Sequence, residues 1–372
     1  MQLLFTLFSL VLCYSQMLCL FSATPGDRMW DMIQTIGTQT CTTESATCIL
    51  ESLVDTTATN LSCAPTPINN LTFTIVTSGS YCLSENLTHG LQIGANNITI
   101  DLNGHSITGS IFLGNTVSNI VIKNGIILDG DPGPFPGSYN PCINGFQFNN
   151  NIVVCDVIIA PLAQAMRFDQ CQNVSISRCY CKGGTTSITF ITCNDITIHN
   201  CIFANTSGAG VFIRTNSNRA IISHCFAYGS NFSAIDSNDI RYEQSAALAS
   251  NGSGFTCNVC NRITVTRCIA CNNQLAGFSN LGTQISVEHC IAKHNGQGFS
   301  FQSGAAPGTP YGIARENLAE SNDVGFVADG NPFGYVANAA ITNTINYNTG
   351  GGSPFFPVAP SAATSYWNNI SA

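Results

Sequence analysis

A heptad of alternating polar and apolar residues recurs through the middle of the chain and limits the fold more than any other feature. Each copy has apolar second and fourth positions, a polar first position and a small closing residue. The six copies are NVSISRC (173–179), DITIHNC (195–201), RAIISHC (219–225), DIRYEQS (239–245), RITVTRC (262–268) and QISVEHC (284–290). Copies that start 20 to 24 residues apart indicate a structural repeat. The alternation inside each copy is that of a short β-strand.

Phenylalanine recurs with the same period, 11 to 13 residues before the closing position of the heptads. The series is Phe146, Phe168, Phe190, Phe212, Phe232, Phe255, Phe278, Phe299 and Phe326. Several members follow a glycine, which permits a tight turn. Each period thus holds at least two short strands, has no helical periodicity, and leaves no room for a crossover helix. We predict an all-β fold, a single-stranded right-handed parallel β-helix of about 22 residues per coil, in which the phenylalanines form one internal stack.

Residues at equivalent positions of successive coils form a column, and the closing column of the heptads is cysteine in five copies of six. We predict that these cysteines face the interior, because a buried free cysteine packs as a small apolar side chain. Stacked neighbours fall within the Cα separation of a disulfide, and the sequence does not choose between thiols and bridges. Cys257-x-x-Cys260 and Cys268-x-x-Cys271 resemble a zinc site in spacing. Since Cys268 belongs to the repeat column, we expect no metal, and no motif indicates a cofactor.

Composition restricts the classes of partner. The net charge is −8, from 12 Lys and Arg against 20 Asp and Glu, and the basic residues form no cluster. Nucleic acid is therefore not an expected partner. Only 9% of residues are charged, yet the chain is too polar for a membrane bundle, so we expect no integral membrane domain beyond a possible N-terminal anchor.

The first 23 residues are apolar and carry no charge, which is typical of a signal peptide or of an uncleaved anchor. We therefore expect an exported protein, either secreted or on the cell surface. Residues 24–70 are interpreted as a cysteine-containing lead-in or cap, 71–350 as the β-helix and 351–372 as a C-terminal cap or tail.

Cysteines and breaks in the period mark the ends and the loops of this arrangement. Four cysteines lie before or at the first coil, namely Cys41, Cys48, Cys63 and Cys82. They are candidates for disulfides that hold an N-terminal cap in place. The Pro- and Gly-rich stretch 131–141 and the stretch 303–310 are expected to protrude as loops that border a binding groove. Trp367 is the expected plug of the last coil.

Three stretches near the start of the repeat carry a resemblance to a known group of proteins. They are GSYCLSENL (79–87), NNITIDLNGHSITGS (96–110) and NIVIKNGIILDG (119–130). They resemble the entry coils of right-handed parallel β-helix repeat proteins of the pectin-lyase-like superfamily. The resemblance implies that Asp101, Asn103 and His105 are turn and capping residues. It also implies, through the best-known members, cleavage of acidic plant polysaccharides, but the polygalacturonase and pectate lyase motifs are absent from this sequence. Fold alone does not assign an activity.

Outward columns beside the closing cysteines hold the densest polar patch of the chain. Glu243 and Glu288 are two coils apart, so about 10 Å separates their backbones, near the upper end of the separation used by inverting glycosidases. They are the candidate catalytic residues. The candidate substrate-binding residues beside them are His224, Arg241, Arg267 and His289. The structural alternative is a solvated sheet face with pairs between coils, such as Glu243 with Arg267.

Two functions from different classes follow from this patch. The first is a secreted or cell-surface module that binds carbohydrate, with a polysaccharide or a cell-surface glycan as its partner and without catalysis. The alternative is a polysaccharide hydrolase or lyase that uses carboxylates on an outward sheet face.

Overall fold

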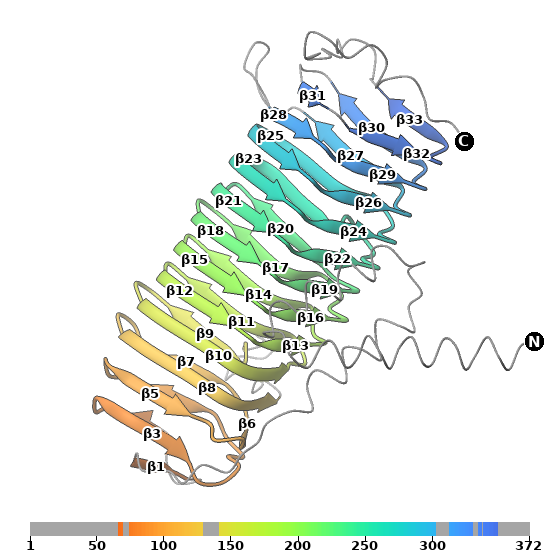
Figure 1. The fold of residues 1–372 in the computed structure, drawn as a ribbon. Helices are drawn as coiled ribbons and strands as arrows, with labels where there is room; N and C mark the ends of the chain where they lie inside the picture. The colour runs from red at the N-terminus through yellow and green to blue at the C-terminus, as the bar shows by residue number, and fades with distance from the viewer. Residues whose placement is uncertain are drawn as a thin grey trace, which may run out of the picture.

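The chain folds into one right-handed parallel β-solenoid of about eleven turns with roughly 22 residues per coil (Figure 1). This computed structural model describes residues 66–69, 74–128, 141–302, 312–329, 334–336 and 338–348, which contain no helix. The described strands pair in parallel with their counterparts in neighbouring coils. The predicted fold class is therefore confirmed.

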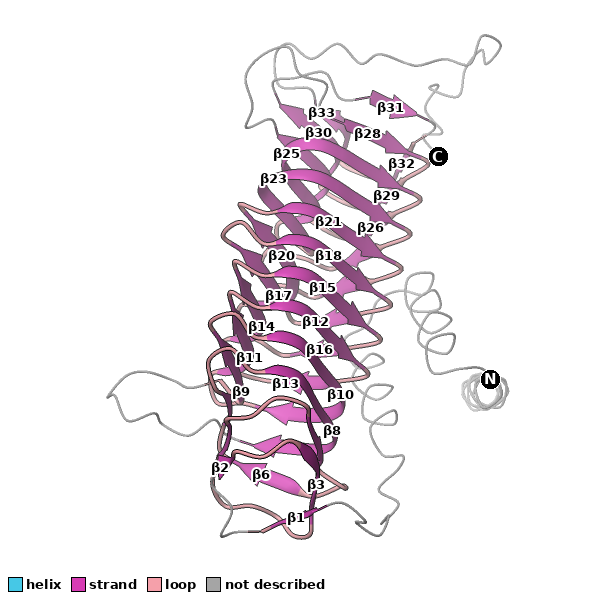
Figure 2. Cartoon of the chain, turned by 90° about the vertical axis from the view of Figure 1, so that its left-hand side faces the viewer, coloured by secondary structure: helices cyan, strands magenta, loops and turns pink. Residues whose placement is uncertain are grey.

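The strands form three faces along the solenoid, which we call sheets A, B and C (Figure 2). Sheet A contains β1 (Thr66–Ile68), β3 (Gly79–Leu83), β5 (Ile98–Asp101), the first parts of β8 (Ser118–Leu128) and β10 (Asn150–Ala160), β12 (Gln172–Ser177), β15 (Asn194–His199), β18 (Asn218–Ser223), β21 (Asn238–Glu243), the second parts of β23 (Phe255–Thr266) and β25 (Ala276–Glu288), β28 (Gly312–Arg315) and β31 (Gly334–Val336). Sheet B contains β6 (Ser106–Thr108), the second parts of β8 and β10, β13 (Tyr180–Lys182), β16 (Ile202–Ala204), β19 (Phe226–Tyr228), β22 (Ala246–Leu248), β24 (Ile269–Cys271), β26 (Ile291–Lys293), β29 (Leu318–Glu320) and β32 (Ala339–Ile341). Sheet C contains β2 (Thr74–Ile75), β4 (Leu91–Ile93), β7 (Ile111–Leu113), β9 (Ile143–Phe146), β11 (Gln164–Asp169), β14 (Thr186–Ile191), β17 (Ala209–Arg214), β20 (Asn231–Ile235), the first parts of β23 and β25, β27 (Gln297–Gln302), β30 (Val324–Asp329) and β33 (Ile345–Asn348).

The heptads are the strands of sheet A with the turn that follows them, as their alternation predicts. Their apolar positions pair with one another across coils, for example Ile176 with Ile198 and Ile198 with Ile222, and these side chains are buried. The closing column, formed by Cys179, Cys201, Cys225, Ser245, Cys268 and Cys290, is also buried. The predicted interior placement of these cysteines is therefore confirmed. All five of them are free thiols and form no disulfide with one another.

The single phenylalanine stack is wrong, because sheet C contains two inward columns. Phe168 and Phe190 stack in one of them, with ring centroids 5.5 Å apart. Phe190 pairs with Ile213, while Val211 pairs with Phe232, so the later phenylalanines occupy the other column. That second column runs as Phe232, Phe255, Phe278, Phe299 and Phe326, with successive centroids 4.8 to 5.1 Å apart.

Two members of the predicted stack point outward instead. Phe212 lies between the inward residues Val211 and Ile213, and the guanidinium of Arg214 sits 5.5 Å from its ring centroid. Phe146 is one residue out of register with Phe168 and lies under the guanidinium of Arg167. A strand has a period of two, so a shift of one residue moves a side chain to the opposite face.

Turn positions with positive φ close the corners of the coils. Asn103 has a φ of 50°, and its backbone N–H donates to Oδ1 of Asp101 at 2.9 Å. Asp101 also accepts from Asn124 and pairs with Lys123 on the next coil. Such positions favour Asn and Asp, whose short side chains bond locally. Asn103 is therefore a turn residue, and Asp101, the last residue of β5, caps that turn through its side chain, as expected.

Several expectations concern residues outside the described part of the chain. These are the export segment 1–23, most of the lead-in with Cys41, Cys48 and Cys63, most of the loop 131–141, the loop 303–310, and the tail 351–372 with Trp367. Within the described part, no helix is long and apolar enough to cross a membrane.

Replacing Phe278 by Ala is expected to lower the free energy of unfolding by about 3 to 5 kcal/mol, because its ring is buried between Phe255 and Phe299. Phe212→Ala is the matched control and should cost only about 1 kcal/mol, since it removes an outward ring under an arginine. Urea denaturation followed by circular dichroism measures both. Equal losses from the two variants would contradict the two-column core.

Candidate functional site

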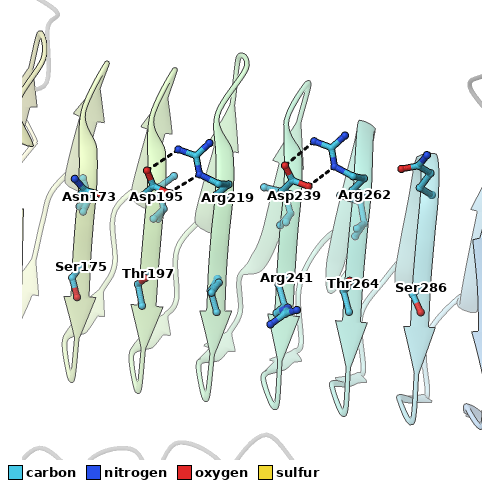
Figure 3. A pocket seen from close by; sticks show the side chains of 16 residues that line it. Asn173, Ser175, Asp195, Thr197, Arg219, Asp239, Arg241, Arg262, Thr264 and Ser286 are labelled. Atoms are coloured by element: carbon cyan, nitrogen blue, oxygen red, sulfur yellow. Dashed lines mark hydrogen bonds and ion pairs between the residues drawn. The ribbon is translucent and has the colours of Figure 1, made fainter.

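A shallow groove of about 750 Å³ runs along the outer face of sheet A, across β12, β15, β18, β21, β23 and β25. Two outward columns supply its polar side chains (Figure 3). The first column is Asn173, Asp195, Arg219, Asp239, Arg262 and Gln284, and the second is Ser175, Thr197, Ile221, Arg241, Thr264 and Ser286. Because each coil contributes one residue to each column, the groove presents a regularly repeated set of side chains.

Acid and base alternate along the first column. Arg219 donates from Nε and Nη2 to the two carboxylate oxygens of Asp195, at 2.6 and 2.7 Å. Arg262 makes the same two-bond contact with Asp239, in which Nη2 donates to Oδ2 at 2.7 Å. Figure 3 shows the two pairs side by side. Paired N–H donors match the two oxygens of a carboxylate, which fixes both side chains in one orientation.

The backbone places these residues at the corner between sheets C and A. Asp195, Arg219, Asp239 and Arg262 have φ values of 55° to 58°. A positive φ is unfavourable for a long side chain such as arginine. The same conformation recurs on each coil, so that the column stays in register and each arginine lies one coil from a carboxylate.

The arginines set the protonation state of the groove carboxylates. Hydrogen bonds from Arg219 hold the pKa of Asp195 below its usual value, and Arg262 does the same to the pKa of Asp239. Each aspartate thus stays ionised at neutral pH with both oxygens engaged. A carboxylate in this state is a poor general acid, because a general acid needs a raised pKa.

The two candidate catalytic residues share one outward column, as predicted. Thr266 lies between them in the order Glu243, Thr266, Glu288. Glu243 pairs with Arg241 of its own strand at 3.4 Å, rather than with Arg267. Glu288 accepts a hydrogen bond from the hydroxyl of Ser286 at 2.8 Å. Neither glutamate is among the residues that line the groove.

Three of the candidate binding residues occupy the turn between sheets A and B. His224, Arg267 and His289 have φ values of 53° to 54°, and they belong to one column. His289 Nδ1 lies 3.2 Å from Glu316 Oε2 on the following coil. These residues stand beside the groove, and only Arg241 of the six candidates lines it.

A histidine pair lies at this corner. The rings of His199 and His224 meet edge to face with centroids 4.9 Å apart, and His199 Nδ1 is 2.9 Å from the hydroxyl of Ser223. Burial, followed by the charges of His224 and Arg178, lowers the pKa of His199. Among the residues that the structure describes, no three His, Cys, Asp or Glu side chains gather in a way that could hold a metal ion.

The Asp–Arg pairs were not predicted, although the sequence contained a signal for them. The first positions of the middle four heptads read Asp, Arg, Asp, Arg. The repeat pattern alone defines this position only as polar. Stacking of the coils brings this alternation, from Asp195 to Arg262, into contact as neighbouring side chains, so the alternation itself is the relevant pattern.

Comparison with known proteins agrees with this architecture. A family model for the right-handed β-helix region matches residues 164–349, which is half of the chain, and the chain therefore belongs to this family. The structural neighbours confirm the resemblance to the pectin-lyase-like fold. No curated protein matches by sequence.

Solved structures with the same fold are distant in sequence. A mutant of the periplasmic alginate epimerase AlgG is 10% identical, with a TM-score of 0.61 over 78% of this chain and 80% of its own. A hyperthermoactive exopolygalacturonase from Thermotoga maritima is 10% identical, with a TM-score of 0.55 over 74% of this chain and 85% of its own. The catalytic domain of a GH87 α-1,3-glucanase, also 10% identical, has a TM-score of 0.51 over 75% of this chain and 64% of its own. At this identity, the similarity concerns the fold alone.

Replacing Arg219 by Gln is expected to raise the pKa of Asp195 toward its ordinary value, since the hydrogen bonds that lower it are lost. Asp239 keeps Arg262 and serves as the internal control, with a pKa that stays low. A depressed folded pKa stabilises the fold above the unfolded pKa, and this stabilisation disappears as the pH falls through the folded value. The variant should therefore lose less stability than the parent on acidification. NMR titration of the side-chain carboxyl carbons measures both pKa values, and an unchanged Asp195 would contradict the pairing.

Proposed function

We propose that this protein is an exported module that binds an extended glycan chain along the sheet A groove without cleaving it. The observation that carries the proposal is the groove itself, in which hydroxyls and guanidinium groups repeat from coil to coil while the aspartates are engaged by arginines. Export is supported by the apolar start of the sequence.

The groove offers the kinds of contact that a sugar polymer uses. Ser175 and Thr197 are neighbours in one outward column, as are Thr264 and Ser286, so that within each pair the hydroxyl groups repeat at about 4.8 Å. This repeat is comparable with the length of one sugar residue in an extended chain. In the same column, Ile221 is 38% exposed and offers an apolar surface to the C–H face of a ring.

The charge of the groove favours an anionic glycan. Arg219, Arg241 and Arg262 line it, in a chain with only 12 basic residues, against two aspartates. The side chain of Arg241 is 53% exposed and contacts Glu243 only at 3.4 Å. Its guanidinium therefore keeps donors for a carboxylate or sulfate on the ligand.

The alternative, a hydrolase or lyase that uses Glu243 and Glu288, has weaker support. The two glutamates lie two coils from each other, and neither lines the groove. Glu243 forms an ion pair with Arg241 of its own strand, and Glu288 accepts a hydrogen bond from Ser286 of its own strand. The similar solved structures are mostly enzymes, but a shared fold does not transfer an activity.

Arg241→Ala is expected to weaken binding of polygalacturonate or alginate by roughly tenfold, because it removes a charged donor from the centre of the groove. Arg214→Ala is the matched control, since Arg214 is an exposed arginine on sheet C and should leave binding unchanged. Isothermal titration calorimetry with these polymers and with neutral dextran measures the effect. Equal loss in both variants, or no binding of any charged or neutral polymer by the parent, would overturn the proposal.

The same polymers test catalysis directly. The parent protein should release neither reducing ends nor ultraviolet-absorbing unsaturated products. Product that disappears in both Glu243→Gln and Glu288→Gln, without a change in melting temperature, would instead establish the enzymatic alternative.

A further inference from the structure

Two histidines of consecutive coils meet at the corner between sheets A and B, beside the groove. His199 is the last residue of β15 and follows the groove residue Thr197 by two positions, so both side chains point outward from the same strand. His224 follows β18 on the next coil. The two rings meet edge to face with centroids 4.9 Å apart. This histidine pair therefore stands where a chain bound in the groove presents its side groups.

The charged groups around the histidine pair already neutralise one another. On the coil before the pair, Arg178 donates to both carboxylate oxygens of Asp156, at 2.6 and 2.7 Å. On the coil after it, Arg241 lies 3.4 Å from Glu243. The strands of sheet B that follow the two histidines, β16 and β19, contain no charged side chain. Two cations and two anions cancel, so no fixed charge is left to balance one that appears on the pair.

The two rings differ in their hydrogen bonds. Nδ1 of His199 lies 2.9 Å from the hydroxyl of Ser223, which holds that ring in place. Nδ1 of His224 is out of contact with solvent and has no hydrogen-bond partner among the described residues. A buried ring nitrogen without a partner is uncommon in folded proteins. The pair thus contains one ring that is anchored and one that still lacks a polar partner.

Protonation would turn the histidine pair into a concentration of positive charge. An imidazolium donates from both ring nitrogens, and two imidazoliums at this distance repel each other. Burial, followed by the charges of His224 and Arg178, already holds the pKa of His199 below its usual value. An anion beside the rings relieves the repulsion and favours the charged forms.

We propose that His199 and His224 form an anion subsite at the edge of the sheet A groove, which binds a carboxylate or sulfate group of the glycan when the rings are protonated. This inference rests on the proposed function, because the subsite extends the same groove, and it adds a dependence on pH. A ligand that favours the imidazolium forms is itself bound more tightly by them, since the coupling between protonation and binding is reciprocal.

The direction of the pH effect follows from the state of His199. Its lowered folded-state pKa means that the folded protein takes up protons less readily than the unfolded chain. The free protein therefore loses stability as the pH falls through the ordinary histidine value of about 6.5. A bound anion raises the pKa of His199 and offsets this loss. Affinity for the anion should rise as the pH falls across the range in which histidine titrates, about 8 to 5.

Calorimetric titration of the full protein with dextran sulfate tests the subsite, because the sulfate groups stay ionised throughout this range. We expect binding at about pH 7.5 through the groove arginines, and roughly tenfold tighter binding at about pH 5. The double variant His199→Gln/His224→Gln should bind with the same affinity at both pH values. Glutamine suits the turn position of His224, since Gln244 occupies the equivalent position of the next coil with a φ of 44°.

His294→Gln is the matched control. His294 is exposed and lies in the turn after β26, between sheets B and C, so this variant should keep the full pH dependence. Equal affinity of the parent protein at both pH values, or a pH dependence that survives in the double variant, would overturn the subsite and leave the proposed function intact. Absence of binding at both pH values would contradict the proposed function, and the subsite with it.

NMR titration of the histidine ring protons gives a second readout on the unaltered protein. With dextran sulfate present, the pKa of His199 should rise, because a neighbouring anion stabilises the imidazolium. Neutral dextran is the control polymer and should leave that pKa where it is in the free protein. A pKa of His199 that is the same with both polymers would also overturn the subsite.

Discussion

Backbone hydrogen bonds between successive coils are the interaction on which the other features of this molecule depend. They continue through the turns as well as the strands: the N–H of Ile202 donates to Cys179, that of Phe226 to Cys201 and that of Ile291 to Cys268, each at 2.9 Å. A strand residue that left this register would lose bonds to two neighbouring coils. The period of about 22 residues is thus a hydrogen-bonding requirement, and any side chain type that recurs with it becomes a continuous column along the solenoid.

The orientation of the interior side chains could be predicted where the sequence pattern of a strand allows only one set of inward positions. The heptads give an unambiguous inward set, so the aliphatic and cysteine columns agree with the structure. Sheet C is different, because each strand has two inward positions that are two residues apart, and the 22-residue period is compatible with either. Phe190 and Phe232 therefore belong to different columns. The prediction that Phe212 faces inward is wrong for a simpler reason. A one-residue offset turns its side chain outward, and this offset arises at the irregular pairing near Ala209, which cannot be recognised from the spacing.

The outer surface was less predictable, because its organisation depends on neighbouring coils and on distant segments. Of the six candidate site residues, Arg241 alone lines the groove. To predict the Asp195–Arg219 and Asp239–Arg262 pairs, the residues at one fixed position have to be compared from coil to coil. Sheet B requires still more, since the segments Ile202–Ala204 and Ala246–Leu248 are apolar throughout and a single coil does not distinguish their inward residues from their outward ones.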